Sequence, residues 1–131
     1  MKKESTLLLF VLLFSSCFRK QQTEYLYGSY KIIKTENIQI DSSKAIIAGF
    51  LQDMRTNQPI PDGSVVIHGT TIGIMSDSIG YFRMTINSGD YIFYAGCMGY
   101  EHHLTKKIKI LPNTKTELFI ELDTMRPISC N

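Results

Sequence analysis

The stretch GTTIGIMSDSIGYF, residues 69–82, combines three glycines, several hydroxyl side chains and one carboxylate. A phosphate-binding P-loop would end in Gly-Lys-Ser/Thr and lead into a helix, and this stretch has neither feature. An EF-hand calcium loop needs oxygen ligands at several alternating positions, whereas Asp77 is the single carboxylate here. The stretch therefore predicts turn chemistry between β-strands, in which Gly69 and Gly73 relax the backbone while Asp77 and Gly80 shape a tight turn.

The sequence on both sides of this stretch consists of short β-prone runs separated by turn residues. Pro59 and Pro61 withhold backbone donors, and Gly63 after them is expected to supply a positive φ. No window of about a dozen residues keeps helical spacing with caps. Strands at intervals of about 8–12 residues indicate a sandwich or barrel, so we predict an all-β fold. The predicted strands cover residues 46–53, 64–69, 81–86, 91–97, 104–111 and 116–123.

Period-two alternation in three of these runs assigns side chains to the core. About 80 residues can bury a modest core, and two sheets packed about 10 Å apart are the expected arrangement. The inward-facing residues are predicted to be Phe82, Met84 and Ile86 in one run, Tyr91, Phe93, Ala95 and Cys97 in the next, and Leu118, Ile120 and Leu122 in the last.

The N-terminal residues 1–17, MKKESTLLLFVLLFSSC, have the plan of a secretion signal. Two lysines precede the uncharged run 7–14, which is shorter than the about 20 residues that a membrane-spanning helix needs. Small residues precede Cys17, and this arrangement resembles the lipobox of bacterial lipoproteins, although Phe14 stands where that motif usually has leucine. We therefore predict a signal peptide over residues 1–16 and a lipid on Cys17. The alternative is an ordinary signal peptide with a chance cysteine.

This prediction places the mature chain at the cell envelope of a Gram-negative bacterium. The residues after Cys17, FRKQQ, lack an acidic surface-export run, so an outer-membrane anchor facing the periplasm is expected. Residues 17–44 are predicted to form a tether, with a possible extra strand in YKIIKTENIQI (30–40). Residues 45–123 are predicted to form the sandwich domain, and residues 124–131 a C-terminal tail. The formal charge of +2, with its basic excess outside the domain, gives no reason to expect a nucleic-acid partner.

The residues that could carry chemistry are scattered along the chain. His102 and His103 are adjacent and would point to opposite faces of a strand, so we expect surface or strand-end histidines and no metal site. His68 could meet them only through the fold. The serines lack a Gly-x-Ser-x-Gly elbow, and Cys97 is expected to be a buried, inert thiol. We therefore expect no catalytic, cofactor-binding or metal-binding residue and no enzyme. An enzyme would need an unforeseen cluster of these histidines with a carboxylate.

Cysteine usage leaves one further alternative open. With a lipid on Cys17, the cysteines Cys97 and Cys130 remain, and an oxidising envelope permits a disulfide between them. Closing a loop of this length would stabilise the fold by about 3–4 kcal/mol. The other possibility is two free thiols, because the sequence does not place Cys130 relative to the domain.

Six motifs in a fixed order, from residue 46 to residue 101, resemble the carboxypeptidase regulatory-like domain. The resemblance extends to about Asp123. It implies a transthyretin-like, antiparallel β-sandwich of about seven strands that is itself non-catalytic and binds no cofactor. The matching positions are Gly49, Leu51 and Asp53; Pro59, Ile60 and Pro61; Gly69 to Gly73; Asp77, Gly80 and Phe82; Gly89, Asp90 and Tyr91; and Gly99, Tyr100 and Glu101.

Two departures from the family pattern stand out. Asp62 replaces the glycine that usually follows the second proline, so that turn is expected to be rebuilt around Gly63. The segment AGC, residues 95–97, replaces bulkier residues, which leaves room in the core or for a partner.

The sequence supports two functional hypotheses. The first is a non-catalytic lipoprotein module with a structural or protein-interaction role, whose edge strands accept a partner strand. The second is an accessory protein of an outer-membrane nutrient uptake system that binds a small ligand, a sugar or a peptide. In that case Tyr81, Tyr94 and Tyr100 would supply stacking faces at one end of the sandwich.

Overall fold

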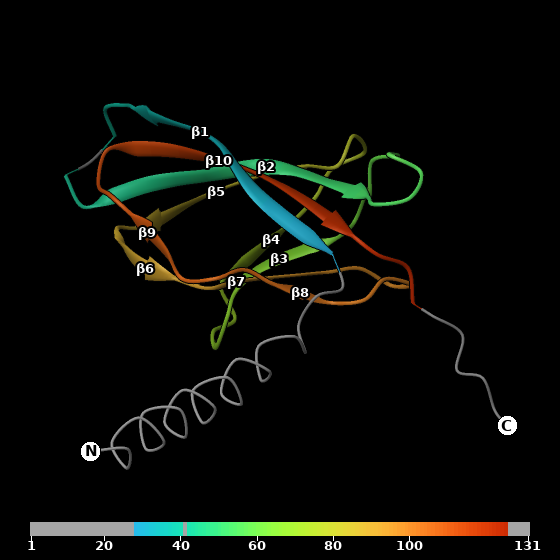
Figure 1. Cartoon of the computed structure of the whole chain (residues 1–131). Coiled ribbons are helices and arrows are strands. Elements are labelled where there is room, and N and C mark those ends of the chain that lie inside the picture. Colours follow the sequence, from blue (N-terminus) through green and yellow to red (C-terminus); the bar gives the residue numbers. More distant parts are fainter. Residues whose placement is uncertain (1–27, 41, 126–131) are drawn as a thin grey trace, which may run out of the picture.

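The computed structural model describes residues 28–40 and 42–125, and two long strands within them, β2 and β10, form the centre of the first sheet. This sheet, sheet A, has the strand order β1-β10-β2-β5 (Figure 1). The pair β10-β2 is parallel, and the other two pairs are antiparallel. The strands of sheet A are β1 (Ser29–Asn37), β2 (Lys44–Asp53), β5 (Tyr81–Asn87) and β10 (Thr114–Leu122).

A second four-stranded sheet, sheet B, lies below sheet A in Figure 1 and has the order β4-β3-β7-β8. A two-stranded piece, β6-β9, lies at one end of the two layers. Among the described residues, no helix is long and apolar enough to cross a membrane. The strands are β3 (Ser64–Ile67), β4 (Gly73–Met75), β7 (Phe93–Gly96), β8 (His103–Leu104), β6 (Gly89–Tyr91) and β9 (Ile108–Ile110).

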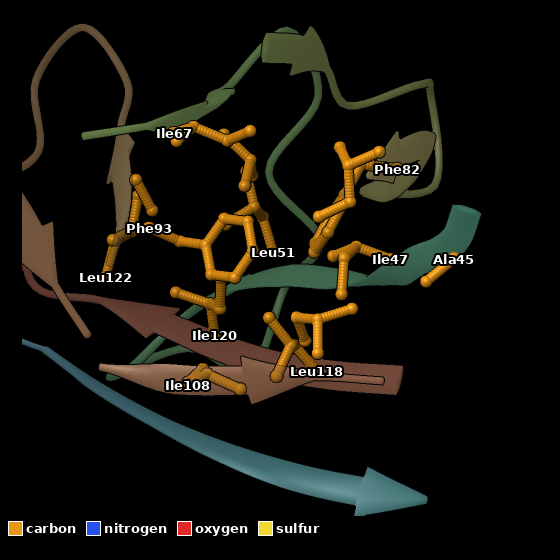
Figure 2. Close-up of a cluster of buried hydrophobic side chains, with 14 of the residues drawn as sticks. Ala45, Ile47, Leu51, Ile67, Phe82, Phe93, Ile108, Leu118, Ile120 and Leu122 are labelled. Atoms are coloured by element: carbon orange, nitrogen blue, oxygen red, sulfur yellow. The ribbon is translucent and has the colours of Figure 1, made fainter. Parts of the chain in front are cut away.

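The core lies between the sheets, and β10 shows most clearly why the sequence folds this way. Every second residue of β10 is buried, and Leu118, Ile120 and Leu122 are completely buried. They pack against Leu51 of β2 and Phe93 of sheet B in one cluster (Figure 2). Fully burying a side chain of this size contributes about 1.5–3 kcal/mol, so this inward row is a main source of stability.

The predicted all-β sandwich is confirmed, with differences in detail. Phe82 and Ile86 are buried and Met84 is partly buried, as the alternation predicts. The expectation of a wholly antiparallel sandwich is wrong for β2 and β10. The chain re-enters sheet A beside the start of β2, where the Asn113 N–H donates to the Lys44 carbonyl (2.8 Å), so both strands run in the same direction.

Three local predictions also change. The predicted strand 91–97 is divided, because β6 pairs with β9 while β7 pairs with β3. The predicted turn region 69–82 contains a short strand, β4. The open question about residues 30–40 is answered by β1, which pairs along β10 with an irregularity between Ile32 and Lys34.

The close approach of β2 and β10 depends on Gly49. A Cβ built on this residue would overlap the Leu118 carbonyl oxygen and lie 2.9 Å from Cζ of Phe82. Both neighbours belong to buried residues, and the nearer atom is backbone, so neither can move aside at low cost.

We expect Gly49→Ala to destabilise the domain by about 1–3 kcal/mol or more, because a methyl group would be forced into a packed strand pair. Denaturant unfolding followed by circular dichroism measures the loss. Gly69→Ala is the control. A Cβ at this position meets no atom within 4 Å, so the substitution costs only the strain of the positive φ. Equal destabilisation by the two substitutions would contradict the packing argument.

Candidate functional site

The stretch 69–82 makes its own hydrogen bonds. The Oδ1 of Asp77 accepts from the N–H of Ile79 (3.0 Å) and of Tyr81 (2.9 Å), and Gly80 has a φ of 78°. Upstream, the Thr70 hydroxyl donates to the Ile67 carbonyl at 2.8 Å. The carboxylate and the backbone of the turn are therefore engaged within the chain, as the turn interpretation predicts.

The other motif residues lie mostly in turns or at close approaches. The expectation that Gly63 supplies a positive φ is wrong, because Asp62 carries it (58°) and Gly63 is instead packed against Leu51. Pro59 forms an isolated bridge with Gln52. Positive φ values also occur at Gly69, Gly89 and Gly99; Gly73 lies in β4 against Val65; and Asp90 is exposed in β6.

The histidines do not gather. His68 and His102 are exposed, and no group of three or more His, Cys, Asp or Glu residues within 28–40 and 42–125 is placed to hold a metal. His103 begins β8, as the strand-end alternative predicts, but it is not at the surface, since it is only 4% exposed. Its register with Ala95 turns it inward, where its ring lies 5.7 Å from that of Tyr30.

Cys97 is half-buried rather than buried, and its Sγ lies 3.9 Å from the Pro61 carbonyl oxygen. Its possible disulfide partner Cys130 and the lipidation residue Cys17 both lie outside the described residues. The disulfide and the lipid therefore stay predictions.

A polar network joins the ends of β2 and β10. Oδ1 of Asp53 accepts from the N–H of Arg55 (2.8 Å) and of Thr56 (3.1 Å), while Oδ2 accepts from the Tyr100 hydroxyl (2.8 Å). Nε of Arg55 donates to Oδ1 of Asp123 at 2.9 Å. Both carboxylates are largely buried, and each has found donors, as buried charges require.

These contacts shift two titrations. The backbone N–H of Arg55, followed by the Tyr100 hydroxyl, holds the pKa of Asp53 below its ordinary value. Burial, followed by the hydrogen bond to Asp53, raises the pKa of Tyr100 to about 12. Both pKa shifts favour the protonation states that make the hydrogen bond, the ionised carboxylate of Asp53 and the protonated hydroxyl of Tyr100. The network therefore stabilises the fold.

The motif residues Asp53 and Tyr100 were read from the sequence as turn residues, and the structure brings them together. Sequence reasoning missed Arg55 and Asp123, since no spacing pattern connects them. Of the three tyrosines predicted as stacking faces, Tyr100 lies in the turn after β7 and contacts Asp53. Tyr81 lies in sheet A and Tyr94 in sheet B, where its hydroxyl contacts His102 Nδ1.

An exposed apolar segment, residues 72–75, includes β4 at the edge of sheet B. Ile72 is 56% exposed and Met75 is 59% exposed, and Ile74 between them is also exposed. Two hollows lie nearby: the first is lined by β4 itself, and the second touches the segment only at Ile72, before β4 begins. One, of about 430 Å³, is lined by Ser64, Val66, Thr71, Gly73, Ile74 and Met75. The other, of about 190 Å³, is lined by Lys44, Ile67, Ile72, Thr85, Ile86, Asn87 and Tyr91.

The order of the motifs, the sandwich and the Asp53–Tyr100 contact can now be set beside known proteins. Residues 47–127, more than half of the chain, match the CarboxypepD_reg-like domain. The chain belongs to this family. The CarboxypepD_reg-like domain is usually a non-catalytic module.

No curated protein matches the sequence of this chain. Among solved structures, 3-chlorocatechol 1,2-dioxygenase from Rhodococcus opacus 1CP is similar with a TM-score of 0.49 and 12% identity, over 87% of this chain and 78% of that chain. Hydroxyquinol 1,2-dioxygenase from Pseudomonas putida DLL-E4 has a TM-score of 0.46 and 10% identity, over 86% and 71%. No property of either enzyme is transferred to this chain.

We expect Tyr100→Phe to cost about 1–2 kcal/mol at neutral pH, because Asp53 keeps its two backbone donors but loses a charge-assisted hydrogen bond. A raised tyrosine pKa stabilises the fold below the unfolded pKa of about 10, and that contribution is lost as the pH rises toward the folded pKa. The free energy of unfolding should therefore fall between about pH 10 and pH 12, and less steeply in Tyr100→Phe.

At acidic pH, the free energy of unfolding depends on pH with the opposite sign. A lowered pKa of Asp53 stabilises the fold above the unfolded pKa of about 3.9 and is lost as the pH falls below it. Urea titrations at several pH values measure the free energy of unfolding and so test both the alkaline and the acidic dependence. An identical alkaline slope in the wild type and in Tyr100→Phe would contradict the assigned contact.

Proposed function

We propose that this chain is a non-catalytic, lipid-anchored module of the cell envelope that binds a partner protein along the edge of β4. The observation that carries the proposal is the exposed apolar edge strand, whose residues line one side of a hollow of about 430 Å³. Strand addition at a sheet edge obtains affinity from main-chain hydrogen bonds and specificity from pockets for alternate side chains.

The backbone of β4 is suited to this role. Ile67 N–H donates to the Ile72 carbonyl and Ser76 N–H donates to the Gly63 carbonyl, so residues 72, 74 and 76 turn their hydrogen-bonding groups toward β3. By the alternation of an antiparallel pair, Gly73 and Met75 turn theirs outward. A partner strand would meet these outward groups first.

The edge of sheet A that β1 forms is less suited. In β1 the exposed residues Ile32 and Ile33 are interrupted by an irregularity, and Lys34 forms an ion pair with Glu36. Charges and bulges are the devices by which edge strands avoid pairing. The segment 69–76 carries no charged side chain, so β4 lacks this protection.

The edge interaction is tested by photocrosslinking in the bacterium that makes the protein. A benzoylphenylalanine at Ile74 should give a discrete adduct with one envelope protein, and the same group at Ile33 on β1 should not. In the Ile74 background, Met75→Pro should remove the adduct, because proline has no N–H to donate, while Met75→Ala should retain much of it. Equal crosslinking from both edges, or an adduct that survives Met75→Pro, would contradict the proposal.

The lipid anchor is tested separately. Cys17→Ser should move the protein from the membrane fraction to the soluble fraction, because the buried acyl chains hold such a protein at about 0.8 kcal/mol per methylene. Metabolic labelling with an alkyne fatty acid should mark the wild type alone. A serine variant that remains membrane-bound and labelled would exclude Cys17 as the anchor.

A further inference from the structure

We propose a second binding site, on the outer face of sheet A, for a neutral saccharide. The strand register places Lys31, Phe119, Phe50 and Tyr81 in one row that crosses all four strands. Their neighbours along the strands, among them Leu51, Phe82 and Leu118, point into the core, so the row faces away from sheet B.

The row forms an aromatic platform. The Phe50 and Tyr81 ring centroids lie 5.3 Å apart with a tilt of 58°, and the Lys31 ammonium lies 5.4 Å from the centroid of Phe119. Phe50 at the centre is 39% exposed. Phe119 is half-buried and has the Lys31 ammonium over its ring, so Phe50 is the ring more open to a ligand.

A hollow of about 270 Å³ adjoins the platform. Its wall combines Phe50 and Phe119 with the loop after β2 and the turn before β5. Its polar side chains are the amides of Gln52 and Asn57, and none of its lining residues carries a charge. The full lining is Phe50, Leu51, Gln52, Asn57, Pro59, Ile79 and Phe119.

This chemistry fits a pyranose ring. One face of such a ring presents C–H groups with a slight positive charge, which the negative face of an aromatic ring attracts. The rim of the sugar presents hydroxyls, which amide side chains can bind as donors and as acceptors. The lining of the hollow offers an ionic ligand no partner charge, since Lys31 lies outside it. The Gln52 Nε2 donates to the Asn57 backbone carbonyl, which leaves the Gln52 Oε1 and the Asn57 amide to bind hydroxyls that a purely apolar ligand lacks.

The platform is independent of the proposed partner edge, because β4 belongs to sheet B and lies outside this row. Sequence reasoning named only Tyr81 of these residues as a stacking face. Phe50 and Phe119 lie at outward positions of β2 and β10. The inward positions of the same two strands contribute to the core.

The test uses the full chain in a polyoxyethylene detergent, which carries no sugar headgroup. A glycan array of neutral oligosaccharides, including β-glucans, α-glucans, xylans and mannans, identifies a ligand, and calorimetry then measures its affinity. We expect Phe50→Ala and Phe119→Ala each to weaken binding by about tenfold or more, while Phe50→Tyr retains it. Tyr94→Ala, on the outer face of sheet B, is the matched control and should bind as the wild type does. Thermal unfolding confirms that each variant is folded.

Failure to bind any glycan of the array at millimolar concentration would overturn the proposal. Binding that Phe50→Ala and Phe119→Ala leave unchanged would overturn it equally. Loss of the protein adduct formed at Ile74 in these two variants, without glycan binding by the wild type, would assign the platform to the partner protein instead. Because the Ile74 adduct is scored separately, the failure of one site is distinguishable from the failure of the other.

Discussion

The parallel pairing of β2 with β10 is the contact on which the rest of the structure depends. It joins strands from opposite ends of the domain, with Ile46 beside Lys115 and Asp53 beside Leu122. Parallel neighbours cannot be joined by a short turn, so the chain between them must cross over the molecule, and here the crossover includes all of sheet B. The absence of a side chain at Gly49 lets the two backbones approach.

The polar network continues the same pairing beyond the last buried leucine. Asp53 is the last residue of β2 and Asp123 directly follows β10, and the Arg55 side chain connects the first of these segments to the second. The Tyr100 hydroxyl donates to Asp53 from the turn after β7, so this hydrogen bond links sheet B to the end of β2 in sheet A. The family's ordered motifs at Asp53 and Tyr100 thus mark the two halves of one structural contact.

The sequence predicted those features of the fold that neighbouring residues determine. Alternation located the inward rows of β5 and β10, and turn chemistry explained Asp77 and Gly80. Features that depend on distant strands escaped prediction. The burial of His103 follows from its pairing with Ala95, and the aromatic row follows from the register of four strands. Edge position makes β4 a candidate site, and no local pattern distinguishes an edge strand from a central one.

The place of β1 has a mechanical consequence. This nine-residue strand lies at the edge of sheet A, and within the sheet it pairs with β10 alone. Tension on the chain ahead of Ser29 therefore reaches the β1–β10 hydrogen bonds before it reaches any other strand pair. Because β10 keeps β2 as its other neighbour, β1 can peel away while the central pair stays closed, and the released strand adds roughly 30 Å of reach. A domain built in this way lengthens under load before it unfolds.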